Sequence, residues 1–66
     1  MQKLIENELH KRGYEIQYYM IKKNEYDGAL PYNEWEVKII RNGDVHGLAF
    51  YPNKEIALIN ALIELI

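Results

Sequence analysis

The chain lacks cysteine, serine and threonine altogether. Without cysteine it has no disulfides, no cysteine-ligated zinc and no thiol catalysis, a composition typical of a reducing compartment such as the cytoplasm. Without serine and threonine it has no hydroxyl nucleophile other than tyrosine, and no ligand of the kind that holds magnesium in a P-loop. These absences exclude several classes of enzyme, and we expect a non-enzymatic protein with no cofactor.

Positive charge and long apolar runs are also sparse. The net charge is −2, the isoelectric point is near 5.6, and lysine and arginine occur singly or in pairs. Proteins that hold nucleic acid through its phosphates usually carry a basic cluster, so nucleic acid is a disfavoured partner. The most apolar segment, residues 56–66, is too short to cross a bilayer, and no signal-peptide pattern is present. We therefore expect a cytoplasmic protein that does not enter a membrane.

The residues that are present suit a folded domain. Of the 66 residues, 48% are hydrophobic, two are proline, and six tyrosines, one tryptophan and one phenylalanine offer large side chains for burial. This composition predicts a single domain over residues 1–66 rather than a disordered chain. A core of this size is marginal, and oligomerisation is the usual supplement.

The dipeptide Asn42-Gly43 separates two alternating runs within residues 35–51. This arrangement predicts a β-hairpin, because a type I′ turn needs a positive φ at both central residues. A regular register pairs Arg41 with Asp44, Ile39 with His46, Val37 with Leu48 and Trp35 with Phe50. We expect these apolar residues, with Tyr14 of the preceding strand, in the core. The expected open face of the hairpin carries Glu34, Glu36, Lys38, Gly47 and Ala49, with Ile40 and Val45 beside the turn.

Other segments complete the fold. Residues 1–12 have helical periodicity and end at Gly13, while residues 14–22 alternate as a strand with Tyr14, Ile16, Tyr18 and Met20 inward. Residues 24–33 form a long loop. A last helix begins after Asn53, a favourable N-cap, and its apolar arc of roughly 180° exceeds the ~100° that one sheet covers. The first helix or a second copy of the chain would cover the excess, as in a homodimer.

The predicted fold class is therefore α+β, with the order α-β-β-β-α. The three strands form an antiparallel meander, and both helices pack on one face of it. This leaves the other face open, since an antiparallel sheet can be covered on one side only.

Several short motifs match a known small-protein pattern over residues 4–66: Gly13-Tyr14, Trp35-Glu36-Val37, Asn42-Gly43, Ala49 and Ala57-Leu58-Ile59-Asn60-Ala61-Leu62. In these motifs the chain resembles the phage ABA sandwich type of small protein. The resemblance implies a phage or prophage origin and transfers no catalytic residue. The topology is also similar to the double-stranded RNA-binding domain. That family has a cluster of lysines at the start of its second helix, and Lys54 is the only residue of this chain that matches it.

Tyrosines beside acidic residues are common on surfaces that bind proteins. The expected partner-binding residues lie in the loop and on the open sheet face: Tyr19, Tyr26, Asp27, Tyr32, Glu34, Glu36 and Tyr51. An alternative for Tyr26 and Tyr32 is that they fold back to extend the core.

The alternative function is nucleic-acid binding, in which aromatic side chains on the sheet stack on bases near lysines. Its candidate residues are Lys22, Lys23, Lys38 and Lys54. His10 and His46 belong to no recognised ligand spacing, so no metal site is expected.

Overall fold

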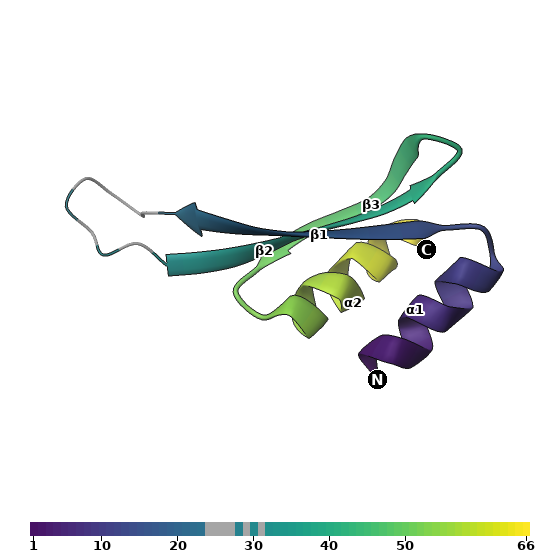
Figure 1. Ribbon diagram of the computed structural model, residues 1–66, viewed down its shortest axis with the longest axis horizontal. Helices are drawn as coiled ribbons and strands as arrows, with labels where there is room; N and C mark the ends of the chain where they lie inside the picture. The colour runs from purple at the N-terminus through teal and green to yellow at the C-terminus, as the bar shows by residue number, and fades with distance from the viewer. Residues whose placement is uncertain (24–27, 29, 31) are drawn as a thin grey trace.

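The computed structural model describes residues 1–23, 28, 30 and 32–66. Its elements are α1 (Gln2–Lys11), β1 (Glu15–Lys23), β2 (Tyr32–Arg41), β3 (Asp44–Tyr51) and α2 (Lys54–Leu65). The strands form one antiparallel sheet in the order β1-β2-β3. Both helices lie on the same side of this sheet (Figure 1). The predicted α-β-β-β-α architecture is therefore confirmed.

Local sequence signals set the helix ends and the tight turn. Gly13 follows α1 with a φ of +86°, and the Tyr14 amide donates to the Leu9 carbonyl at 3.0 Å, which satisfies a carbonyl at the helix end. Before α2, the Asn53 side chain accepts a hydrogen bond of 3.0 Å from the Ile56 amide. Between β2 and β3, Asn42 and Gly43 have φ values of +53° and +80°. All three predicted signals are confirmed.

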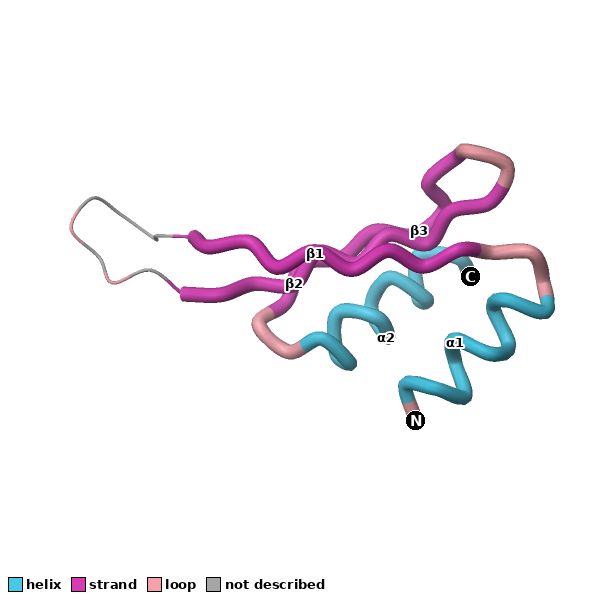
Figure 2. Tube along the Cα trace, in the orientation of Figure 1, coloured by secondary structure: helices cyan, strands magenta, loops and turns pink. Residues whose placement is uncertain are grey.

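The β1–β2 ribbon is longer than the helices that cover it. It continues past the start of α2 (Figure 2), and the chain extends over 44 × 25 × 18 Å. Its radius of gyration is 13.1 Å, against about 11 Å for a compact chain of this length. On β1 the even-numbered residues face the helices as predicted, but Met20 lies beyond them and is 54% exposed.

The predicted register of the β2–β3 hairpin is wrong beyond the turn. Arg41 pairs with Asp44 and Ile40 with Val45 as expected, but a β-bulge then intervenes and His46 becomes an extra residue. The remaining pairs shift by one residue and join Ile39 to Gly47, Lys38 to Leu48, Val37 to Ala49, Glu36 to Phe50 and Trp35 to Tyr51. Because side chains alternate along a strand, a shift of one residue exchanges the two faces of β3.

The bulge gives β3 a covered face made of small residues. Gly47 and Ala49 face α2, and the helix presents Ala57 and Ala61 to the sheet. A Cβ atom on Gly47 would overlap the carbonyl oxygen of Ala61 and lie 3.2 Å from its carbonyl carbon. Strand and helix backbones therefore meet more closely than large side chains would allow. This close approach explains why the larger side chains of the strand face away from the helix.

Five predicted placements are corrected by this register. Gly47 and Ala49 were expected on the open face, yet they lie under α2. Phe50 and Leu48 were expected in the core, yet both lie on the open face and are 38% and 40% exposed. Tyr51 was expected on the open face, yet it pairs with Trp35 on the helix side. Trp35 and Tyr14 pack against the core as predicted. His46 is exposed and makes an edge contact with the Tyr14 ring.

Among the residues that the structure describes, the buried core is small and entirely apolar. Its buried members come from α1, β2, β3 and α2: Leu9, Val37, Ile39, Ala49, Ala57, Leu58 and Ala61. One polar contact ties α1 to the sheet, since the Tyr18 hydroxyl donates a hydrogen bond of 2.7 Å to a Glu6 carboxylate oxygen. Partial burial, this hydrogen bond and the nearby negative charge all raise the pKa of the Tyr18 hydroxyl.

The first helix does not cover the surplus apolar arc of α2. Ile56, Ile63 and Ile66 remain 46%, 60% and 98% exposed. Beside them, an apolar groove of about 680 Å³ lies between the helices, with Leu4, Ile5 and Leu9 on one wall and Leu62, Leu65 and Ile66 on the other. Within the described residues, no helix is long and apolar enough to cross a membrane.

Candidate functional site

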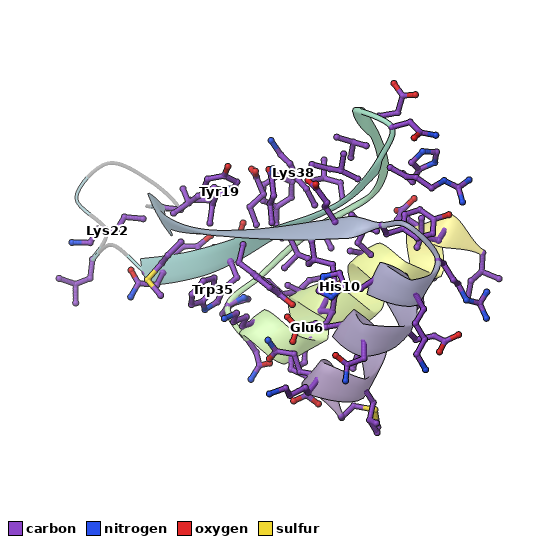
Figure 3. All side chains as sticks on the ribbon, turned by 45° about the vertical axis from the view of Figure 1, so that its right-hand side comes forward. Glu6, His10, Tyr19, Lys22, Trp35 and Lys38 are labelled. Carbon is purple, nitrogen blue, oxygen red and sulfur yellow. The ribbon has the colours of Figure 1, made fainter. Side chains whose placement is uncertain are left out.

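The sheet face turned away from both helices is the candidate site, and we call it the open face. It is formed by alternate residues of all three strands. Figure 3 shows Tyr19 and Lys38 on this side of the sheet, and Glu6 and His10 on the helix side. The pairings place on it Glu15, Gln17, Tyr19, Ile21 and Lys23 of β1, Tyr32, Glu34, Glu36, Lys38 and Ile40 of β2, and Val45, Leu48 and Phe50 of β3.

Large apolar side chains occupy the two outer strands of the open face. On β3, Val45 is 51% exposed, and Leu48 and Phe50 are exposed beside it; on β1, Tyr19 is 50% exposed. Sequence reasoning missed Leu48 and Phe50 because an unbulged hairpin places them inward. The alternation of Gly47 and Ala49 with larger neighbours was the available signal, since two small residues on one face suit a closely packed helix.

The central strand carries charge that is compensated locally. Lys23 forms an ion pair of 3.0 Å with Glu34, and Lys38 one of 3.4 Å with Glu36. The hydrogen bond to Glu34 raises the pKa of the Lys23 ammonium. The same ammonium lies 4.9 Å from the centre of the Phe50 ring. Such exposed ion pairs contribute little stability, but they remove most of the net charge from the middle of the face.

Four of the predicted partner-binding residues lie together. Tyr19 pairs with Glu36, and Tyr32 and Glu34 lie further along the same face of the β1–β2 ribbon. Tyr51 is on the opposite side of the sheet, as the bulge requires. Tyr26 and Asp27 lie outside the described residues.

The four lysines of the nucleic-acid alternative do not form one cluster. Lys23 and Lys38 are on the open face, where each is paired with a glutamate. Lys22 and Lys54 are on the helix side. There the Lys54 ammonium lies 4.4 Å from the Tyr18 ring centre and 5.0 Å from that of Trp35. The lysines are thus divided between two faces.

The described residues contain no group of three histidine or acidic side chains that could hold a metal ion. His10 is exposed on α1. A second cleft adjoins the hairpin turn and is lined by Gly13, Glu15, Gln17, Ile40, Arg41, Asn42 and Gly43. Its charged side chains are Glu15 and Arg41.

Comparisons of the chain with models of protein families, with curated proteins and with solved structures find no match. The resemblances to the phage ABA sandwich type and to the double-stranded RNA-binding domain stay predictions.

Proposed function

We propose that the protein acts without catalysis, by binding another protein through its open face. The observation that carries this proposal is the exposure of Tyr19, Leu48 and Phe50 on either side of the central strand, on a face whose two lysines are each paired with a glutamate of that strand. The centres of protein interfaces are poor in uncompensated charge and rich in aromatic side chains. The open face has both features.

The same surface indicates the chemistry of the partner. The face carries three carboxylates, those of Glu15, Glu34 and Glu36, and two ammonium groups, those of Lys23 and Lys38. A partner with an apolar centre and a mildly basic rim would complement it. If the resemblance to phage ABA sandwich proteins reflects origin, the partner would be a protein of the host.

The proposal is tested by capture with immobilised wild-type protein and two lysine variants. Phe50→Lys places a charge in the open face, whereas Met20→Lys introduces the same charge at a site 54% exposed on the helix side of the ribbon. Loss of an aromatic anchor from an interface typically costs about 2 kcal/mol or more, or roughly 30-fold in affinity. We expect a partner that binds the wild type and Met20→Lys, and binds Phe50→Lys at least that much more weakly.

Circular dichroism and urea unfolding of both variants provide the control for folding. Both replaced side chains are substantially exposed, so neither change should unfold the chain. Equal binding by the wild type and by folded Phe50→Lys would contradict the proposal. So would a partner that is lost only with Met20→Lys.

One observation favours a second candidate function, a nucleic-acid-binding module. Tyr19 and Phe50 lie near Lys38 and Lys23, with ammonium-to-ring distances of 5.7 and 4.9 Å, and exposed aromatics beside lysines can stack single-stranded bases. The glutamates paired with these lysines would repel phosphate. A salt-dependent mobility shift with RNA or DNA that is lost in Tyr19→Ala would favour this function, whereas unchanged mobility at low salt would eliminate it.

A further inference from the structure

Helix α2 is apolar on two opposite sides. One side packs Ala57, Leu58 and Ala61 against the sheet. The other side carries Ile56, Ile59 and Ile63, and the C-cap residue Ile66 continues it. When the helix is extended by that one residue, the four isoleucines fall within about 80° of one another at 3.6 residues per turn. We call these four residues the isoleucine stripe. Three of them are exposed and Ile59 is half-buried, so the stripe is the largest aliphatic surface on α2 outside the core.

The spacing of the stripe identifies what covers it. Its members follow one another at intervals of three, four and three residues, which is the repeat of a coiled-coil seam. These intervals read the same in both directions along the helix. Two antiparallel copies related by a twofold axis therefore bring Ile56 against Ile66 of the other copy, and Ile59 against Ile63. We propose that the stripe is the interface of a homodimer.

The absence of charge in the isoleucine stripe and the dipole of α2 both favour a second copy of the chain as the partner that covers the stripe. An isologous contact places each patch against itself, so a charge within the patch would meet its own sign. The stripe contains none. The last turn of α2 has no basic residue to offset the negative end of its dipole. In the antiparallel arrangement, the positive N-terminal end of the other α2 lies beside it.

The size of the interface predicts its strength. The stripe and Leu4 of the neighbouring helix, 72% exposed, make five side chains per copy, against roughly 20–30 residues a side in a standard interface. We therefore expect a dimer that dissociates at micromolar concentrations. Its layers would run sheet, helices, helices, sheet, so both open faces would point outward. Dimerisation thus does not depend on the proposed function of that face.

Sedimentation equilibrium over a concentration series tests the proposal on the whole chain. We expect a reversible monomer–dimer equilibrium in the wild type and at least a 100-fold weaker one in Ile63→Glu. The matched control is Val45→Glu, which puts the same charge on a residue 51% exposed on the open face and should leave dimerisation unchanged. A wild type that stays monomeric would overturn the proposal. So would a dimer that Val45→Glu disrupts or that folded Ile63→Glu retains.

Cross-linking tests the antiparallel orientation, and the absence of native cysteine makes it specific. At a rise of 1.5 Å per residue, the two copies of position 60 are offset by about 3 Å along the helices, and those of position 55 by about 18 Å. A phenylene bismaleimide is too short to bridge the offset at position 55. It should therefore link the two copies of Asn60→Cys and leave those of Glu55→Cys unlinked. Equal linkage of both variants would overturn the antiparallel seam.

Discussion

Adding one methyl group at Gly47 should separate α2 from the sheet. The Cβ of Gly47→Ala would overlap the carbonyl oxygen of Ala61 and lie 3.4 Å from the Ile39 Cδ1 atom. The first obstacle is helix backbone, which cannot rotate away as a side chain can. Overpacking a core typically costs about 1–3 kcal/mol of folding stability. Because the obstacle here is backbone, we expect a loss at the upper end of that range, about 3 kcal/mol.

That loss is large for this chain. At roughly 0.05–0.15 kcal/mol per residue, 66 residues give a stability of only about 3–10 kcal/mol. In a domain of this size, about 3 kcal/mol corresponds to a fall in melting temperature of roughly 12–24 °C. Urea unfolding followed by circular dichroism gives the free energy directly, provided that the slope with denaturant stays that of the wild type.

Two controls separate the clash from other effects. Gly43→Ala adds the same methyl group in open space at a φ of +80°, so it should lose only the backbone penalty of about 1–2 kcal/mol. Leu48→Ala removes a side chain from the open face and should lose less than about 1 kcal/mol, whereas a buried leucine would lose about 2–5 kcal/mol. If Gly47→Ala is as stable as the wild type, or Leu48→Ala is the more damaging change, the bulged register is wrong.

Other expected outcomes concern the ties between the elements. Tyr18→Phe should lose about 1.5–3 kcal/mol, because its hydrogen bond to Glu6 is to a charged carboxylate. Folding raises the pKa of Tyr18 above the unfolded tyrosine value near 10. The hydrogen bond therefore contributes its full stability below about pH 10, and this contribution is lost as the pH rises from there toward the raised pKa. Melting temperatures measured from about pH 8 to 11 should fall less steeply in Tyr18→Phe than in the wild type. Asn53→Ala should lose about 1 kcal/mol with the α2 cap, while Asn60→Ala, inside the same helix, should be neutral within about 0.5 kcal/mol in urea unfolding. Deleting His46 should leave the fold intact, because His46 is the extra residue of the bulge and has no partner on β2. The deletion should cost about 1 kcal/mol through the lost edge contact with Tyr14, and gross unfolding seen by circular dichroism would contradict this.

The sequence predicts the elements well because their signals are local. Gly13 ends a helix, Asn53 begins one, and Asn42-Gly43 makes a turn through conformational preferences that act within a few residues. The even-numbered residues of β1 likewise face the helix side by simple alternation, although Met20 lies beyond the helices. None of these signals depends on how α2 sits on the sheet.

The faces of β3 could not be predicted from alternation, because they depend on a contact between distant segments. Gly47 lies against Ala61, and the small residues there allow an approach that Leu48 or Phe50 would prevent. Patterns of hydrophobicity rank Leu and Phe as more inward than Gly and Ala, so they favour the wrong register. The same displacement moves Tyr51 off the candidate site and adds two apolar residues to it.

A methyl NMR titration of the captured partner into the labelled protein tests the role of the open face most directly. Ile21, Ile40, Val45 and Leu48 report on that face, and Ile56 and Ile63 on the isoleucine stripe. We expect shifts and broadening of the open-face methyls at partner concentrations that leave the stripe methyls unchanged. Perturbation confined to the stripe, with the open-face methyls unaffected at saturation, would contradict the assignment of the open face as the binding surface.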